Sequence, residues 1–222
     1  MINGGVILRL LIKNGYECEF EWDKDSNLSD FEKLISVILT QNTKWQNVLK
    51  SLALLKDKKI TNLNELIKLD VSNLAILIKP SGFYNTKAKR ILDLAKKILL
   101  DYENLDNFFN NVDREWLLAC KGISYESADS ILNYLCKKEY LVIDSYTLRF
   151  MSNLGYEFNY YDEVAEKLMS GLDDEYFYKY FKCNELYEIY SKFHSMLLNF
   201  CKVHFKGKKI DEKGMEILKE LL

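Results

Sequence analysis

The stretch WLLACKGISYESADSILNYLCKKEYLVIDSYTLRF, residues 116–150, decides the fold of this 222-residue chain. Its opening Trp-Leu-Leu ends one apolar helical stripe, and Gly122 can adopt backbone angles that other residues resist. Ser124 is a favourable N-cap, so a second helix is expected from Tyr125. The stretch therefore predicts a helix, a tight turn and a second helix, followed by a short apolar run that ends at Asp144.

The start of the second helix is suited to binding an anion. The first backbone N–H groups of a helix have no partner within it and carry the positive end of the helix dipole, so a phosphate oxygen fits there without a basic side chain. Downstream, Asp144 stands at the start of a further helical pattern that Gly155 closes. The stretch favours a module that binds a nucleic-acid backbone and places one carboxylate beside it.

The whole chain has the composition of an all-α protein. It contains a single proline, nine glycines and long apolar stripes with a 3.6-residue period. Its length allows one large or two modest domains. No stretch is apolar enough to span a bilayer and no signal peptide begins the chain, so we expect a cytoplasmic protein without a membrane partner. The clearest stripes span 31–56, 85–102, 124–136 and 185–203.

The cysteines and histidines do not form a metal-binding pattern. Five cysteines are scattered without a Cys-x-x-Cys pair, which predicts reduced, mostly buried thiols. His194 and His204 are more typical of hydrogen-bonded packing residues than of ligands, and no further ligand is suitably spaced. The sequence therefore predicts no metal site.

The charge is nearly balanced, with a net value of −2, which argues mildly against indiscriminate nucleic-acid binding. A local basic face is still allowed. Basic side chains gather at 87–97 on one predicted helix, and Lys121, Lys137, Lys138 and Lys202 flank the motif segments. For the 87–97 group, a solvated helix face and a DNA-binding face are both open.

Four segments follow one another in an order that points to a family. They are Ile-Leu-Thr-Gln-Asn-Thr at 38–43, Pro-Ser-Gly-Phe-Tyr-Asn-Thr-Lys-Ala-Lys at 80–89, Cys-Lys-Gly-Ile-Ser at 120–124 with Val-Ile-Asp at 142–144, and Phe-His at 193–194 leading to Lys202. Together they resemble the helix-hairpin-helix DNA glycosylases of the endonuclease III superfamily, over roughly residues 28–205. Any one of these motifs alone is weak, whereas the four in order are specific.

The resemblance implies two helical domains with a DNA-binding groove between them. Residues 29–132 would form one bundle that contains the helix-hairpin-helix motif. Residues 1–28 would join 133–222 in the second domain. The resemblance also implies that the hairpin at Gly122 and the carboxylate of Asp144 face each other across the groove.

Asp144 is the candidate catalytic residue. Cleavage of an N-glycosidic bond builds oxocarbenium-like charge on the sugar, which a nearby carboxylate can stabilise while it orients or deprotonates water. An aspartate before Ser-Tyr-Thr-Leu is also an ordinary helix N-cap. Both roles can hold together, because the positive end of the helix dipole keeps the carboxylate ionised.

Glu126 decides which chemistry the resemblance implies. The family's hairpin reads Leu-Pro-Gly-Val-Gly, and Ser124 takes the place of its last glycine in this chain. Bifunctional members of the family carry a lysine two residues past that last glycine, and its amine forms a Schiff base with the sugar. This chain has Glu126 at that place. A glutamate cannot form an imine, so the resemblance implies a monofunctional glycosylase without AP lyase activity.

Other positions follow from the tasks of base excision. An enzyme of this kind takes the nucleotide out of the stack, fills the gap and holds the base in a pocket. Gln41 and Asn42 are the candidates for an intercalating wedge, with a helix cap as the alternative for Gln41. Trp22 and Trp45 are the candidates for the base pocket, because electron-rich rings suit a cationic alkylated purine. Packing roles are the alternative for both tryptophans.

Backbone contacts and cofactors follow from the same resemblance. Lys121, Gly122, Ser124 and Lys202 are the candidates for contacts to the DNA backbone. Many relatives hold an iron-sulfur cluster with four cysteines after the Phe-His segment, but Phe205 occupies the first of those places and no cysteine follows it. We therefore expect no cluster and no other cofactor, and leave open a monovalent cation bound through carbonyl oxygens of the hairpin.

The closest likeness is to the bacterial endonuclease III-like 3-methyladenine DNA glycosylases. Two departures from their pattern are Trp22-Asp23-Lys24 in place of Trp-Trp-Pro, and Met196 in place of a lysine after Phe-His-x. The expected function is removal of alkylated purines, 3-methyladenine above all, from damaged double-stranded DNA by a monomer. The alternatives are a glycosylase for mismatched or oxidised bases and a non-catalytic DNA-binding protein of the same fold.

Overall fold

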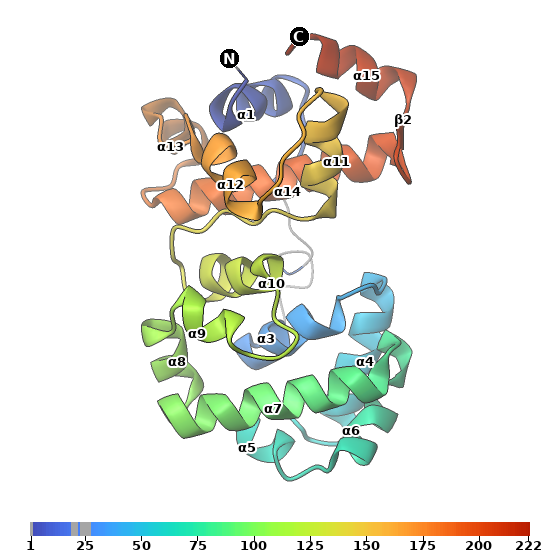
Figure 1. The fold of residues 1–222 in the computed structure, drawn as a ribbon. Helices are drawn as coiled ribbons and strands as arrows, with labels where there is room; N and C mark the ends of the chain where they lie inside the picture. The colour runs from blue at the N-terminus through green and yellow to red at the C-terminus, as the bar shows by residue number, and fades with distance from the viewer. Residues whose placement is uncertain (1, 19–21, 23–27) are drawn as a thin grey trace. The chain divides into compact units, whose positions relative to one another are not determined.

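The computed structural model describes residues 2–18, 22 and 28–222, and it is mostly helical. The chain divides into two compact units, whose helices are drawn in Figure 1. One unit is Asp25–Cys136, and the other combines Met1–Lys24 with Lys137–Leu222. The expected first domain, residues 29–132, lies inside the bounds of the former.

The unit 25–136 consists of helices only in its described part. Its elements are α3 Asp30–Leu39, α4 Trp45–Asp57, α5 Leu63–Leu66, α6 Val71–Leu77, η1 Lys79–Ser81, α7 Tyr84–Tyr102, α8 Leu105–Asn111, α9 Arg114–Leu118, α10 Tyr125–Ser130 and the π-helical turn η2 Ile131–Leu135. The sequence predicts one helix over 124–136. The structure has two continuous segments there, because the chain changes at Ile131 from an α-helix to the wider π-helix.

The other unit adds one short strand pair to its helices. Its elements are α1 Gly4–Lys13, α11 Ser145–Asn153, α12 Tyr161–Met169, α13 Glu175–Phe181, α14 Leu186–His204, β1 Phe205–Lys206, β2 Lys209–Ile210 and α15 Glu212–Lys219. The two strands pair antiparallel, with Phe205 opposite Ile210. Gly207, at a φ of 64°, lies in the turn that joins them.

Helix α7 is the long central element of the unit 25–136 (Figure 1). Its apolar stripe, which includes Ile91, Leu94, Ala95 and Ile98, is buried as the sequence pattern predicts. Helices α3, α5, α6 and α8 all pack against it. The stripe thus sets the position of both the turn after α3 and the segment that precedes α7.

Helix α14 has the same central place in the other unit. Phe193, Met196 and Phe200 are buried on it, and α1, α11, α13 and α15 pack against it. The start of α1 approaches α12 so closely that a Cβ at Gly4 would lie 1.7 Å from the carbonyl oxygen of Leu168. Only glycine allows this approach, which places the amino-terminal helix beside the carboxyl-terminal half of the chain.

Side-chain caps begin many of the helices where the sequence predicts them. Ser29 and Glu32 form a reciprocal capping box at α3, and Asp113 caps α9. Ser124 and Asp144 cap α10 and α11. Each cap satisfies backbone N–H groups that have no partner within the helix, so the local sequence determines where these helices begin.

An ion pair joins the two helices of the hairpin. Arg114 Nε and Nη2 donate to the two carboxylate oxygens of Asp129, at 2.8 and 2.9 Å. The side chain of Asp129 is only 1% exposed and that of Arg114 is 20% exposed. This two-point contact holds α9 against α10 on either side of the turn at Gly122.

Replacement of Asp129 by alanine should lower the free energy of unfolding by about 3 kcal/mol, because it leaves a mostly buried guanidinium without its carboxylate. Urea denaturation followed by circular dichroism measures this loss. Glu65→Ala is the control, since Glu65 pairs with Lys68 on the surface and its loss should cost less than about 1 kcal/mol. Equal losses in the two variants would contradict the structural role given to the Arg114–Asp129 pair.

Candidate functional site

The hairpin bend at Gly122 requires a glycine for two reasons. Its φ of 91° lies in the left-handed region that L side chains rarely adopt. A Cβ at this position would also lie 2.3 Å from Cδ of Arg90, so the arginine side chain crosses the bend in direct contact. The hairpin is therefore built together with α7, which carries Arg90.

Gln41 links the turn after α3 to the same bend. Its Nε2 donates to the carbonyl oxygen of Gly122 at 3.0 Å and to Ser127 Oγ at 3.2 Å. Its Oε1 accepts from Arg90 Nη1 at 3.2 Å. Gln41, the predicted wedge, is thus held against the hairpin in this structure, and it would exchange these hydrogen bonds to enter a duplex.

Two further residues, in the turn after α3 and at the start of α7, are more exposed than Gln41. Asn42 is exposed and has a φ of 53°, a left-handed conformation that asparagine tolerates. Phe83 also has a left-handed backbone, with a φ of 44°, and is 73% exposed at the start of α7. A large apolar side chain held out at a strained position is a signal of function that the sequence did not reveal.

Lys87 corrects one expectation about the basic 87–97 group. It is not on a solvated face, because it is only 2% exposed. Its Nζ donates to the carbonyl oxygens of Leu39 and Ser81 and to Thr43 Oγ1, at 2.7, 2.8 and 2.8 Å. Burial, and then the charge of Arg90, lower the pKa of Lys87 to about 8, so the ammonium form still predominates at neutral pH.

The other basic side chains of the 87–97 group also lie in different environments. Lys97 lies over the ring of Trp116, with Nζ 4.1 Å from the ring centroid, and so covers the surface of α9. Lys89 and Lys96 are exposed and Arg90 is half-buried. Only these last three basic side chains of the group remain for contact with a ligand.

Asp144, the predicted catalytic residue, caps α11 through one oxygen. Its Oδ1 accepts from the backbone N–H groups of Tyr146 and Thr147, at 3.0 and 2.7 Å, and from Thr147 Oγ1 at 2.9 Å. The run before it is held by a hydrogen bond from the Ile143 N–H to Tyr161 Oη, at 3.0 Å. These contacts fix the orientation of the carboxylate and leave Oδ2 outside the cap.

His194 of α14 lies beside the second oxygen of Asp144. Its Nε2 is 3.7 Å from Oδ2, and the two side chains are 5% and 13% exposed. Burial alone raises the pKa of Asp144, but His194 and the hydrogen bonds from Thr147 together lower it by more than burial raises it, to below its ordinary value of 3.8. Asp144 is therefore a partly accessible carboxylate that stays ionised.

The remaining predicted site residues are distributed over both units. Trp45 begins α4 and is half-buried, whereas Trp22 is buried. Lys121 and Ser124 are exposed at the hairpin, and Lys202 is exposed in the last turn of α14. Asp23-Lys24, where the sequence departs from the Trp-Trp-Pro pattern, lies outside the described residues.

The segment after α14 is held by a chain of hydrogen bonds. His204 Nε2 lies 2.6 Å from Tyr16 Oη, and its Nδ1 lies 2.8 Å from Asp211 Oδ1. Phe205 is buried at the start of β1. His204 is thus a packing residue, as the sequence predicts, and it joins the end of α14 to the start of α15.

The described residues do not supply the ligands of an iron-sulfur cluster. Their five cysteines are free thiols, and no group of three or more His, Cys, Asp or Glu side chains among them is placed to hold a metal ion. None of the described helices combines the length and apolarity that a bilayer crossing requires.

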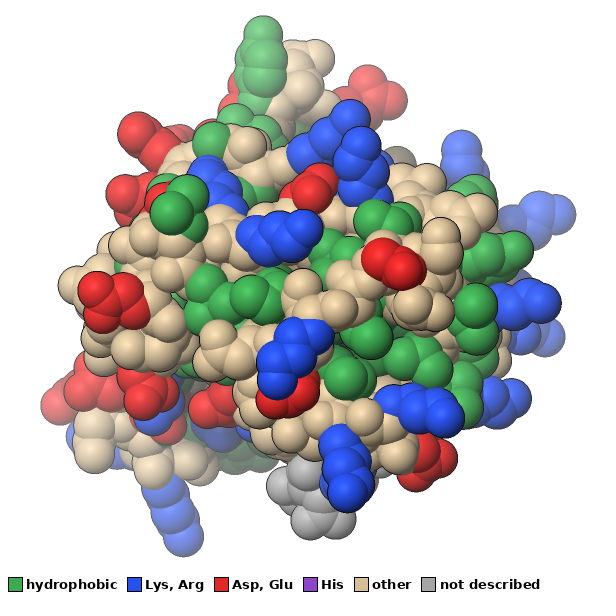
Figure 2. All heavy atoms as spheres, turned by 90° about the horizontal axis from the view of Figure 1, so that it is seen from below, with side chains coloured by type: hydrophobic (Ala, Val, Ile, Leu, Met, Phe, Trp, Pro, Cys, Tyr) green, Lys and Arg blue, Asp and Glu red, His purple; other side chains and the backbone are tan. Residues whose placement is uncertain are grey.

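Charge is mixed on the face of the molecule that Figure 2 shows. On the face shown in Figure 2, Lys and Arg side chains are interspersed with Asp, Glu and apolar side chains. A broad basic field does not cover this face, which is consistent with the net charge of −2. Contact with a polyanion would therefore rely on local groups of cations.

The arrangement of helices and the hairpin defines a class of DNA repair protein. Residues 35–174 match the model of the HhH-GPD superfamily of base excision DNA repair proteins. The chain therefore belongs to this superfamily and is a base excision repair glycosylase. The fold and the family that the sequence predicts are confirmed.

Particular relatives make the likeness more specific. A protein of Methanocaldococcus jannaschii that carries the name of a DNA repair glycosylase is 33% identical over 187 residues, which are 81% of this chain and 80% of that protein. Endonuclease III of Buchnera aphidicola from Acyrthosiphon pisum is 35% identical over 144 residues, 64% of either chain.

Solved structures show the same relation. The 3-methyladenine DNA glycosylase of H. pylori, in complex with 1,N6-ethenoadenine, is 36% identical to this chain, with a TM-score of 0.80 over 92% of this chain and 100% of that one. An endonuclease III–DNA complex has a TM-score of 0.72 at 20% identity, over 99% of this chain and 95% of the other, and so shares the fold.

Lys87→Met should lower the free energy of unfolding by about 3 kcal/mol, because loss of the ammonium group removes three hydrogen bonds at a buried position. The turn that carries Gln41 and Asn42 should also exchange its amide hydrogens faster, since Thr43 is one of those acceptors. Urea denaturation and hydrogen exchange measure the two effects. Lys89→Met, at an exposed site on the same helix, is the control. If both variants unfold at the same urea concentration, Lys87 has no clamping role.

Proposed function

We propose that this chain is a monofunctional glycosylase that excises alkylated purines, with 3-methyladenine as the preferred base, from double-stranded DNA. The single observation that carries the chemistry is the carboxylate of Asp144, which is held ionised with Oδ1 in the helix cap and Oδ2 outside it. The likeness at 36% identity to a 3-methyladenine DNA glycosylase supports the choice of substrate.

Oδ2 has the chemistry that base release needs. As the bond between C1′ and the base nitrogen breaks, the base leaves with the electron pair and positive charge develops on the sugar. An ionised carboxylate stabilises that charge, and it accepts a proton from the water that adds to C1′. Because Oδ1 is fixed by three donors, Oδ2 does not need to reorganise during the step.

An alkylated purine is the substrate that makes the least demand on acid catalysis. A purine such as 3-methyladenine already carries positive charge, so its glycosidic bond is weakened before any protonation. A cationic ring also stacks well on electron-rich aromatic faces. Trp45, half-buried at the start of α4, and Trp22 are the proposed walls of the base pocket.

Glu126 is the reason for proposing hydrolysis without strand cleavage. It lies in the first turn of α10, at the place where bifunctional relatives have the lysine that attacks the sugar. A carboxylate cannot form a Schiff base. A Glu126 side chain in this position therefore leaves water as the nucleophile and an abasic site as the product.

The DNA contacts in this proposal come from both units. Lys121, Gly122 and Ser124 at the hairpin contact one stretch of sugar-phosphate backbone through the lysine and the N–H groups at the start of α10. Lys202 contributes a contact from α14. The turn that carries Gln41 and Asn42 fills the space of the displaced nucleotide, and exposed Phe83 is a second side chain suited to stacking within the duplex.

Asp144→Asn should slow the release of 3-methyladenine from methylated duplex DNA by about 100-fold or more, because an amide does not stabilise the sugar cation. Single-turnover assays that separate free base from DNA measure this rate. Since the pKa of Asp144 lies below 3.8, the wild-type enzyme should not lose this carboxylate on acidification until the pH falls below 3.8.

Asp174→Asn is the matched control for Asp144→Asn. Asp174 caps α13 in the same unit through a hydrogen bond from the Tyr176 N–H, and it lies on the surface. Its replacement removes the charge of a helix-capping carboxylate, leaves an amide oxygen that can still cap, and does not touch the proposed chemistry. Equal slowing in both variants would assign the effect to folding, and full activity of Asp144→Asn would overturn the proposal. Lesion duplexes with oxidised or mismatched bases test the choice of substrate.

The wild-type enzyme should form no covalent complex with DNA in the presence of sodium borohydride, because Glu126 offers no amine for an imine. Denaturing gels of a labelled lesion duplex measure both trapping and strand breaks. The product strand should remain intact until hot alkali cleaves it at the abasic site. A trapped complex, or strand cleavage without alkali, would contradict the monofunctional mechanism.

A further inference from the structure

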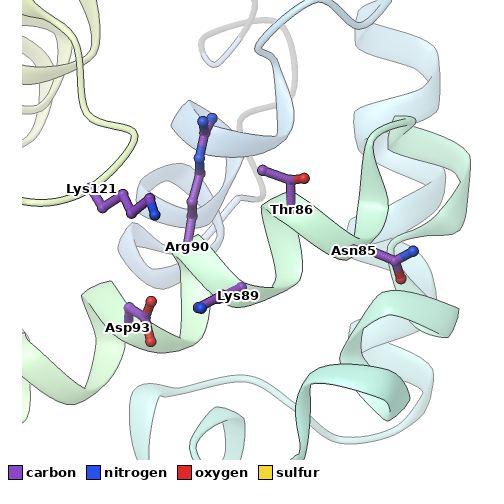
Figure 3. Close-up of a pocket in the computed structure, with 6 residues that line it drawn as sticks. All are labelled: Asn85, Thr86, Lys89, Arg90, Asp93 and Lys121. Atoms are coloured by element: carbon purple, nitrogen blue, oxygen red, sulfur yellow. The ribbon is translucent and has the colours of Figure 1, made fainter.

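A hollow in the unit 25–136 lies between the hairpin and α7. It has a volume of about 330 Å³ and is lined by Asn85, Thr86, Lys89, Arg90, Asp93 and Lys121. Figure 3 shows Lys121 reaching toward α7 from the hairpin, while the other five side chains project from α7 itself. None of the α7 residues belongs to the hairpin contacts that the proposed function uses.

The lining of the hollow is predominantly cationic. Lys89, Arg90 and Lys121 carry positive charge, and Asp93 carries the one negative charge among the lining side chains. Asn85 and Thr86 add neutral groups that can donate hydrogen bonds. In a chain with a net charge of −2, such a local excess of cations marks a place for an anion.

Arg90 is prepared for this role by its own contacts. Its Nη1 donates to Gln41 Oε1 at 3.2 Å, and its side chain rests against the bend at Gly122. Its Nε is buried and has no hydrogen-bond partner within the described part of the chain. An arginine whose rotamer is already fixed loses little conformational freedom when it binds an anion.

We propose that this hollow is a binding subsite for a phosphate group of the DNA backbone, formed by Lys89 and Arg90 of α7 together with Lys121 of the hairpin. The inference rests on the proposed function only for the nature of the ligand, duplex DNA. It adds a phosphate contact on α7 to those at the hairpin. The subsite reads no base, so it binds damaged and undamaged DNA alike.

The subsite also fixes the wedge turn relative to the backbone of the DNA. Arg90 is at once a wall of the hollow and a hydrogen-bond partner of Gln41. A phosphate in the hollow is therefore held at a set distance from the turn that carries Gln41 and Asn42. For the same reason Arg90 is unsuited to the test, because its replacement would also release Gln41.

The test is the salt dependence of binding to an undamaged duplex, measured by fluorescence anisotropy across a series of salt concentrations. Each phosphate contact that is lost reduces the slope of log K against log salt by about 0.9. Lys89→Gln should reduce the slope by about this amount and weaken binding at every concentration. Lys56→Gln, at an exposed lysine of α4 outside the hollow, is the matched control and should leave the slope unchanged.

Asp93→Asn tests the sign of the ligand's charge. Removal of the one carboxylate in the lining should tighten binding of the undamaged duplex about two- to five-fold. Weaker binding in Asp93→Asn would show that the hollow does not hold an anion. If Lys89→Gln retains the slope and the affinity of Lys56→Gln, the proposed subsite is wrong.

The outcomes separate this inference from the proposed function. Loss of slope in Lys89→Gln together with no base release by the wild-type enzyme would support the subsite and overturn the glycosylase proposal. Base release by the wild-type enzyme with an unchanged slope in Lys89→Gln would support the glycosylase proposal and overturn the subsite. Absence of any salt-dependent binding by the wild-type protein would overturn both.

Discussion

The contact between the Arg90 side chain and the bend at Gly122 is the constraint on which the binding surface of the unit 25–136 depends. Glycine is needed there for its positive φ and because any Cβ would overlap the arginine. The same guanidinium donates to Gln41, whose amide donates to the carbonyl oxygen of Gly122. Three segments far apart in the sequence are thereby joined through one closed set of contacts, and displacement of any one would disturb the other two.

Asp144 shows that a structural and a catalytic role can share one side chain. A helix cap uses one carboxylate oxygen, and here Oδ1 takes all three hydrogen bonds. The cap holds the group in one rotamer, while His194 and Thr147 lower its pKa against the effect of burial. The proposed chemistry needs an ionised and immobile carboxylate with one oxygen outside the cap. A helix N-terminus provides these properties at low cost in stability.

Lys87 gives a structural role to one residue of the 80–89 segment, which is among the motifs that relate this chain to its family. In the run Pro-Ser-Gly-Phe-Tyr-Asn-Thr-Lys-Ala-Lys, the lysines at 87 and 89 are two residues apart and point in different directions on α7. Lys87 is buried and holds the end of α3, the turn at Thr43 and Ser81 together. Lys89 is exposed in the lining of the hollow. One charged pattern thus contains a stabilising residue and a proposed ligand-binding residue.

The sequence by itself determined the features that depend on near neighbours. Apolar stripes, N-caps at Ser124 and Asp144, the glycine at 122 and the glutamate at 126 are all local, and from them follow the helical fold, the family and the candidate acid. Only the tertiary structure decided which side chains meet. Burial of Lys87 depends on acceptors from residues 39, 43 and 81, and the place of His194 beside Asp144 depends on the packing of α14 against α11. Periodicity shows which face of a helix is buried, but it does not show which distant atoms will satisfy a charge on that face.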